Sequence, residues 1–486
     1  MDISYNRAKI WQIALFALNN VSTNLFLLIM GSISYYANGI AGIAALMVSF
    51  LIAAMCIFDG ITDPAIGFII DKTDSKFGKF RPSMVIGYGI MATSAWILFH
   101  TLHQVPEGWS IPYFILIYGL YIVGYTFQTA CTKSAQSCLT NDPKQRPLLA
   151  LFDGLFSGLL FGGIPIYTSM YLEPKHGGFT LSFFEEYIGF VVIGAGICTA
   201  LAVFGIREKD TPEFYQIKEG QKVTLQEYWD VICHNRPLSL LVFSAATDKL
   251  AATITATAVV PVMVFGILAQ DFEQYGKLNI YTAPLVLLFL AISVRKAQTK
   301  GQKKTLVQYT ILSIFFASIL GLLMIFGDMT QLDIGFTNFN LFSLLFVGFY
   351  VLMRAATSIC SVIVVPMIAD CTDYEIYRSG NYIPGMIGTL FSFVDKMVSS
   401  LATVIIGLSL AMIGFGEIQP SLETPNSPEI LAVSVFLLVG MPILGWVISL
   451  IAMKFYPLTA EKMCEIQGEI EQIKKGIRSE QNEKIT

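Results

Sequence analysis

Apolar residues occur in long blocks along this chain, and shorter polar segments separate the blocks. About twelve of these blocks are long enough for a helix to cross a bilayer. They cover residues 9–37, 42–70, 83–104, 111–138, 148–172, 183–206, 237–266, 278–295, 305–326, 339–368, 384–415 and 429–455. The polar segment 207–236 is the longest interruption, and it divides the blocks into six and six. The pattern therefore predicts an all-α membrane protein with twelve transmembrane helices in two six-helix halves.

The pattern divides the chain into four parts: an N-terminal half over 1–206, a cytoplasmic central loop over 207–236, a C-terminal half over 237–455 and a cytoplasmic tail over 456–486. In each half, the second block ends in a basic turn, and parallel halves of this kind are the layout of major facilitator transporters. Apolar positions at helical spacing predict an amphipathic tail helix, which either packs on the protein or lies on lipid.

Basic residues gather in alternate loops, which sets the expected orientation. Lysine and arginine are concentrated in 72–81, 144–146, 207–236 and 295–304 and in the tail, and the other loops carry few. Because positive residues stay on the cytoplasmic side, we expect a multi-pass protein of the cell membrane with both termini in the cytoplasm.

Composition agrees with a membrane setting and narrows the function. The chain is 54% hydrophobic and 14% charged, with a mean hydropathy of +0.63. Its formal net charge of −4 does not indicate a nucleic-acid partner. The eight cysteines form no CxxC pair, and no hydrolase, metalloprotease or phosphate-binding motif occurs. We therefore expect no cofactor and no nucleic-acid partner, and the lipid bilayer as one partner. A small-molecule solute, a monovalent cation and a monomeric state are further expectations.

The most informative segment is FDGITDPAIGFIIDKTDSKFGKFRP, residues 58–82. Asp59 and Asp63 lie four residues apart within an apolar block, so they share one helix face. Carboxylates at membrane depth cost about 2.5–3.5 kcal/mol each on insertion scales. Two on one face can hold a small cation between them, although structural partners or a cytoplasmic vestibule would also accommodate them.

These residues also resemble a known family. The spacing D-x-x-x-D-P-x-x-G, the basic turn behind it, LTNDPKQR (139–146), MIADCTDYE (367–375), FSFVDKMVSSLA (391–402) and FYPLTAEK (455–462) are similar to motifs of the glycoside–pentoside–hexuronide:cation symporters. The best-known member of that family is the melibiose carrier, and the family belongs to the major facilitator superfamily. The matches cover both halves in the family's order.

The resemblance implies a site for Na⁺, Li⁺ or H⁺, which is the expected metal site. It assigns the cation to Asp59 and Asp63, with Thr126 and, at the position of a family acid, Thr129. Lys133 stands where the family has a ring-stacking aromatic residue. Further solute contacts are expected from the other polar and charged residues at membrane depth: Asn20, Asn24, Asp153, Lys249, Arg354 and Lys396.

Several of these groups have an alternative role. Asp153, Asp248 and Asp395 can equally form structural ion pairs between helices. The turn residues Asp71, Lys72, Lys79 and Arg81 are expected to hold a cytoplasmic gate closed through charge contacts.

The expected function is cation-coupled symport of a sugar derivative by alternating access. The basic residues favour an acidic solute such as a hexuronide. A neutral sugar symporter and a Na⁺-coupled transporter of lipid or another organic solute remain alternatives. A membrane enzyme lacks any supporting motif, and a non-transporting sensor does not explain the two acids.

Overall fold

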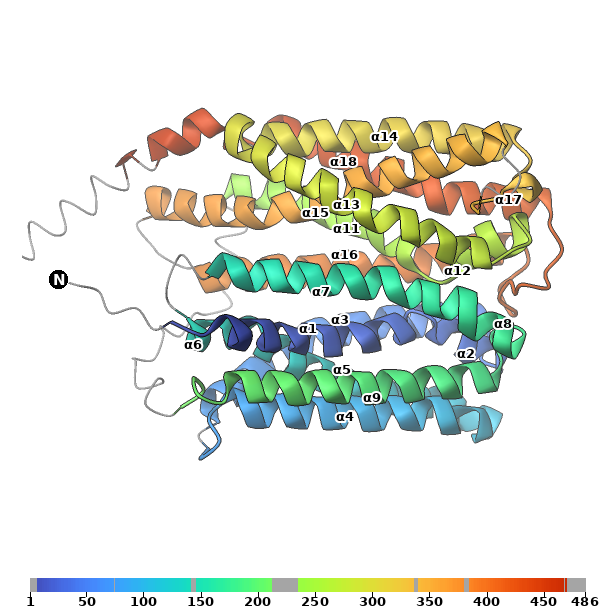
Figure 1. Cartoon of the computed structure of the whole chain (residues 1–486), viewed down its shortest axis with the longest axis horizontal. Coiled ribbons are helices and arrows are strands. Elements are labelled where there is room, and N and C mark those ends of the chain that lie inside the picture. Colours follow the sequence, from blue (N-terminus) through green and yellow to red (C-terminus); the bar gives the residue numbers. More distant parts are fainter. Residues whose placement is uncertain are drawn as a thin grey trace, which may run out of the picture. The chain divides into compact units, whose positions relative to one another are not determined.

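The computed structural model describes residues 7–73, 75–140, 146–211, 235–335, 340–379, 384–466 and 468–469. In these ranges the chain is helical, with short turns and no strand. The long helices are α1 (Ile10–Met30), α3 (Ala45–Lys72), α4 (Phe80–Thr101), α5 (Glu107–Ser134), α7 (Arg146–Tyr167), α9 (Leu181–Ile206), α11 (Arg236–Ala256), α13 (Glu273–Lys300), α14 (Gln302–Phe326), α15 (Leu341–Ser379), α16 (Pro384–Met412) and α18 (Met441–Phe455) (Figure 1). Shorter helices are α2 (Ile33–Gly39), α6 (Gln136–Leu139), α8 (Glu173–His176), α12 (Val259–Pro261) and α17 (Pro428–Val435).

Eleven helices in the described ranges are long and apolar enough to cross a membrane. They correspond to eleven of the twelve predicted blocks. The remaining block, 384–415, contains α16, of which Lys396–Met412 counts as a shorter apolar helix. The side chains of 384–392 lie outside the described set, so the twelfth span stays a prediction.

The predicted block 237–266 is wrong as one continuous helix. α11 ends at Ala256, and after a bend α12 leads into a π-helical segment over Val262–Leu268. Pro261 explains the interruption, because its ring clashes with the carbonyl four residues earlier and it has no N–H to donate.

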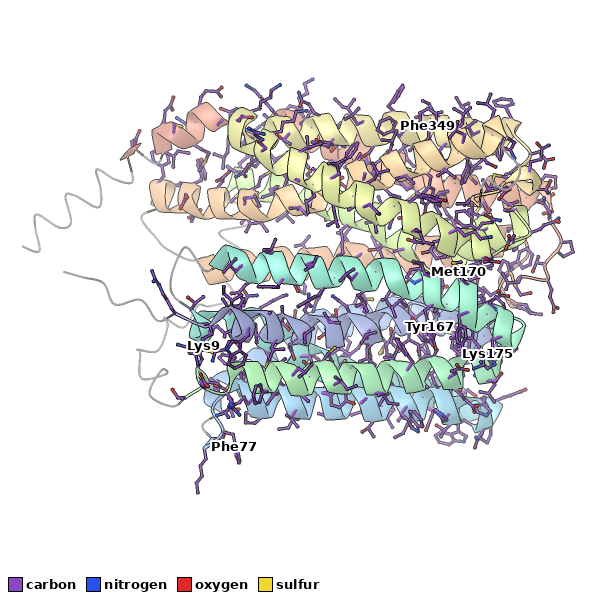
Figure 2. The ribbon with its side chains drawn as sticks, viewed as in Figure 1. Lys9, Phe77, Tyr167, Met170, Lys175 and Phe349 are labelled. Carbon is purple, nitrogen blue, oxygen red and sulfur yellow. The ribbon has the colours of Figure 1, made fainter. Side chains whose placement is uncertain are left out.

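The helices carry large apolar side chains on their outer surfaces as well as inside (Figure 2). Leu116 of α5, Leu159 of α7 and Ile193 of α9 are each more than 60% exposed. A helix that is apolar all round is typical of a membrane span, so these faces are suited to contact lipid.

By its contacts the chain forms two compact units, each of which has its own core. Unit 1 comprises 1–220, 256–283 and 403–433. In it α1 packs against α7 and α9, α4 against α5 and α9, and α3 against α5. A Cβ atom at Gly124 of α5 would come within 2.5 Å of the Met91 nitrogen on α4, so glycine is needed where these two backbones cross. Small residues of this kind allow close helix packing within a membrane.

Unit 1 also contains a cluster of hydrogen bonds between segments far apart in the chain, which we term the Asn38 latch. The Asn38 side chain donates to the carbonyl oxygens of Ile43 (2.9 Å) and Glu417 (2.6 Å) and accepts from the Gln419 N–H (2.6 Å). Nearby, the Ala45 N–H donates to the Glu417 oxygen at 3.0 Å. The latch therefore ties the end of α2 and the loop after it to the segment after α16.

Unit 2 comprises 221–255, 284–402 and 434–486, and in it α14 packs against α15 and α18. The beginning of the tail belongs to the core of this unit. Leu458 and Ile466 are almost fully buried, Met463 packs beside them, and Lys303 donates to the Tyr456 carbonyl at 2.6 Å. The described part of the tail therefore packs on the protein, whereas the predicted helix beyond residue 469 lies outside the described residues.

Candidate functional site

The two acids of the proposed cation site lie on one uninterrupted helix. α3 continues through Asp59 and Asp63, and both side chains are half-buried. Tyr125 of α5 is close enough to both carboxyl groups to interact with them electrostatically. The helical spacing read from the sequence therefore does place both acids in the same neighbourhood, beside α5.

A hydroxyl group on α5 contacts one of the two acids. Thr126 is fully buried, and its hydroxyl lies 3.0 Å from Asp59 Oδ1 and 2.9 Å from the Ile122 carbonyl. Its single proton can go to only one of these acceptors at a time. When the proton goes to Ile122, the Thr126 oxygen and the Asp59 carboxylate both present lone pairs, as a cation requires.

The sequence analysis missed Thr62, which lies one residue before Asp63. Its hydroxyl is 3.2 Å from the Thr126 hydroxyl and donates to the Asp59 carbonyl at 3.0 Å. A hydroxyl between two acids on the same helical turn was a signal that could have identified it. The structure thus brings together oxygens of Asp59, Thr62 and Thr126. The predicted ligand Thr129 lies further along α5, where its hydroxyl donates to the Thr126 carbonyl at 3.1 Å.

A second polar group lies between α1 and α7. Asn20 donates to Asp153 Oδ1 at 2.6 Å, and one turn further on Asn24 donates to Ser157 at 3.5 Å. Asp153 therefore has an amide partner on α1, and its role as a structural group or a solute contact stays a prediction. Gly154 lies next to Asp153 on α7, and a Cβ atom added at this glycine would have no neighbouring atom within 4 Å.

The predicted basic contacts differ in exposure. Lys133 is exposed near the end of α5, and Lys249 is exposed on α11. Arg354 of α15 and Lys396 of α16 are half-buried. The Asp395 side chain lies outside the described set. Lys133 belongs to unit 1 and the other three cations belong to unit 2, so their convergence on one solute stays a prediction.

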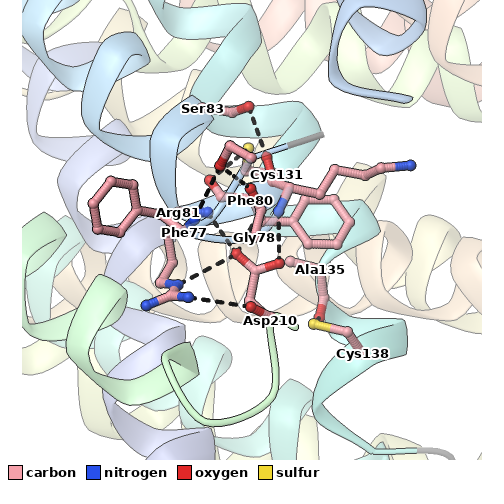
Figure 3. A network of polar contacts seen from close by, with 11 residues as sticks. Phe77, Gly78, Phe80, Arg81, Ser83, Cys131, Ala135, Cys138 and Asp210 are labelled. Atoms are coloured by element: carbon pink, nitrogen blue, oxygen red, sulfur yellow. Dashed lines mark hydrogen bonds and ion pairs between the residues drawn. The ribbon is translucent and has the colours of Figure 1, made fainter. Parts of the chain in front are cut away.

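Two of the predicted gate residues, Lys79 and Arg81, contact an acid at a neighbouring helix end, as expected for the turn, and their gating role stays a prediction. Asp210, just after α9, accepts from the backbone N–H groups of Lys79, Phe80 and Arg81 at 2.8–3.1 Å (Figure 3). The Arg81 guanidinium donates to the Asp210 carbonyl at 3.2 Å and lies 3.6 Å from its carboxylate. Asp210 therefore caps the N-terminus of α4, where a negative charge is favourable.

This cap requires the neighbouring glycine and involves Lys79 through its backbone. Gly78 has a φ of +86°, and a Cβ atom there would overlap Asp210. The Asp71 and Lys72 side chains lie outside the described set, so their gating role is still a prediction. Asp210, four residues after the predicted block 183–206, was missed because its partner lies about 130 residues away.

Comparison with known proteins agrees with this architecture. The model of a family described as MFS/sugar transport protein matches residues 14–460. An uncharacterized symporter of Bacillus subtilis, YjmB, is 26% identical over 390 residues, 78% of each chain. A glucuronide carrier protein homolog of Escherichia coli is 23% identical over 95% of both chains. An isoprimeverose transporter of Lactiplantibacillus pentosus is 23% identical, covering 91% of this chain and 87% of its own.

Solved structures share the fold at low sequence identity. The nucleoside transporter NupG superposes with a TM-score of 0.60 at 11% identity, covering 92% of this chain and 99% of its own. A bacterial homologue of the iron transporter ferroportin, in an inward-facing state, gives a TM-score of 0.61 at 13% identity over 91% of this chain and 98% of its own.

Proposed function

Because the chain belongs to the MFS/sugar transport protein family, we propose that it is a cation-coupled symporter of a sugar derivative. The observation that carries the proposal is the oxygen cluster of Asp59, Thr62 and Thr126, with Asp63 on the same face, inside two apolar helices. A site of carboxylate and hydroxyl oxygens can hold Na⁺ or Li⁺, whereas one carboxyl group is enough for H⁺. The coupling ion is therefore a question for experiment.

In this proposal the cation binds first and neutralises the charge of Asp59 and Asp63. Neutralisation orders α3 against α5, because Thr126 of α5 and Asp59 of α3 then share one ion. Ordering raises the affinity for the solute, and by linkage the solute must raise the affinity for the cation by the same factor. The empty or fully loaded protein changes conformation, and the half-loaded protein does not.

We further propose that the solute carries a negative group, as a hexuronide does. Lys133, Lys249, Arg354 and Lys396 supply positive charge, and a guanidinium group can hold a carboxylate with two parallel hydrogen bonds. Asp153, with Asn20 as its partner, can accept from sugar hydroxyls. Names of relatives support a sugar derivative without fixing which one: they include a glucuronide carrier homolog and an isoprimeverose transporter.

The proposed setting is the cell membrane, with both termini in the cytoplasm. The Asp210 cap then lies on the cytoplasmic side and the Asn38 latch on the outer side.

The experiment is accumulation of a panel of glycosides and uronides by proteoliposomes under gradients of Na⁺, Li⁺ or pH. The proposal expects at least one ion gradient to drive accumulation of at least one solute. Asp59→Asn should abolish this accumulation, because it removes a charge from the cation site. Asp328→Asn is the matched control, because Asp328 caps a short exposed turn through Thr330. Equal loss in both variants would contradict the assignment of the site.

A further inference from the structure

Asp248 is a buried acid in unit 2 that the proposed cation site does not use. It lies near the middle of α11 and is only 7% exposed. Its Oδ2 atom accepts from the Ser449 hydroxyl of α18 at 3.1 Å, and Ser449 lies 2.7 Å from the Ser244 hydroxyl. Its Oδ1 atom is buried and has no hydrogen-bond partner in the described part of the chain.

The surroundings of Asp248 do not compensate a negative charge. No lysine or arginine forms an ion pair with Asp248 within the described ranges, and the adjacent Lys249 is exposed. Cys360 of α15 is close enough to interact electrostatically, and it in turn lies 3.5 Å from Thr310 of α14. The groups that face the acid are therefore a thiol and hydroxyls, which carry no positive charge.

Energetics favour the neutral form of this carboxyl group. A charged acid in the middle of a membrane span costs about 2.5–3.5 kcal/mol on insertion scales, and a buried charge without a partner costs several kcal/mol. One hydrogen bond to a charged group returns only about 1.5–3 kcal/mol. Binding a proton removes the charge and the cost with it.

The same geometry argues against a metal ion at this position. A hard cation needs several oxygen ligands, and Asp248 has one neighbouring hydroxyl in direct contact. No group of three or more acidic, histidine or cysteine side chains suitable for a metal occurs among the described residues. A proton needs only one carboxyl oxygen.

Lys249 follows Asp248 directly and is exposed. Because a lysine at membrane depth normally faces a water-filled cavity or the interior of the bundle, we expect water beside this turn of α11. A small movement of α11 against α18 would hydrate the acid, and hydration stabilises the carboxylate and releases the proton.

We propose that Asp248 is a proton-binding site in the C-terminal half, separate from Asp59 and Asp63, and that it takes up and releases a proton during transport. This inference rests on the proposed function for its role in transport, although binding of the proton can be measured without a solute. The reaction is simple: the carboxylate gains one proton to give the neutral acid, and the proton leaves to water when the site opens.

The transport test measures proton uptake and solute uptake together in proteoliposomes that contain a pH-sensitive dye. Asp248→Asn keeps the size of the side chain and an oxygen for Ser449 but cannot titrate. We expect proton uptake in this variant to fall relative to solute uptake, and Asp328→Asn to behave as the wild type does. An unchanged ratio of protons to solute in Asp248→Asn would show that Asp248 is a permanently neutral structural acid.

A second measurement keeps the test valid if Asp248→Asn does not fold. Infrared difference spectra of the wild-type protein, recorded without solute between low and high pH, should show the C=O band of a protonated buried carboxyl group. Ser449→Ala removes the hydrogen bond to Oδ2 and should shift this band while retaining the acid. Absence of the band, or a band that Ser449→Ala leaves unmoved, would overturn the proposal. If the band is found but no solute is carried, the proposed function fails while the proton site stands.

Discussion

Replacing Asn38 by alanine tests whether the Asn38 latch holds the two segments of unit 1 together. The substitution deletes three hydrogen bonds, which join Asn38 to Ile43, Glu417 and Gln419. Glu417 keeps a second partner, because its carbonyl also accepts from Ala45. The Gln419 N–H loses its partner, and Gln419 is only 8% exposed.

The expected loss of stability of the closed form follows from these contacts. An orphaned buried N–H costs about 1–3 kcal/mol, and each lost neutral hydrogen bond costs about 0.5–1.5 kcal/mol. Only the bonds to Glu417 and Gln419 cross between the two segments, because Ile43 lies on the same segment as Asn38. The lower ends of the ranges for these two bonds sum to about 1.5 kcal/mol. When the segments separate, the same groups meet water in both variants, so this penalty applies to the closed form alone. The ratio of open to closed forms should therefore rise about tenfold, since each 1.4 kcal/mol is tenfold.

The assay is the rate at which a thiol reagent labels Ala45→Cys in solubilised protein. Ala45 is 6% exposed in the latched form, so labelling reports opening. Asn38→Ala should speed labelling about tenfold or more. Ser421→Cys, on the exposed part of the loop, should label at the same rate in both backgrounds.

Gln419→Ala is the matched variant, because it removes the neighbouring side chain, with its 3.4 Å bond to Ser34, but keeps the backbone N–H that Asn38 binds. It should change the rate far less than Asn38→Ala does. Equal rates in Asn38→Ala and the wild type would refute the reasoning, because the latch would then not limit opening.

Three further predictions address the solute, the orientation and the cap. Acidic glycosides should compete for transport better than neutral glycosides of the same size, and Lys133→Ala should erase the difference; preference for neutral sugars would show that the basic residues are structural. A cysteine at Gly177 should react with an impermeant reagent from outside intact cells and one at Lys303 should not, and the reverse pattern would overturn the orientation. Asp210→Ala leaves the N–H groups of Lys79, Phe80 and Arg81 without their acceptor and should lower the melting temperature more than Asp328→Ala does, because Asp328 is exposed; equal shifts would argue against the cap.

Much of the fold could be predicted from the sequence because membrane helices are long, apolar and largely local. Eleven of the twelve predicted blocks correspond to candidate spans, and the family was correctly identified from short motifs. The interruption after Ala256 was missed because apolar residues continue through it, so hydropathy alone does not detect the effect of Pro261.

The polar contacts were harder to predict because they join distant parts of the chain. Asp59 and Asp63 share a helix face by their spacing, and this needed no tertiary information. Asn38 and Gln419 are 381 residues apart, and Asp248 and Ser449 are 201 apart. No local pattern indicates such pairs, because the packing of whole helices decides which hydroxyl or amide meets which acid.

The most direct test of the central claim is ion-driven accumulation of solute by Asp63→Asn and Asp59→Asn in proteoliposomes, with correct insertion verified for each variant. Our account predicts that both lose accumulation under the Na⁺, Li⁺ or pH gradient that drives the wild type, because either change removes half of the charge that holds the cation. Accumulation at the wild-type level in either variant would show that this acid is not needed for coupling, and accumulation in both would contradict the account.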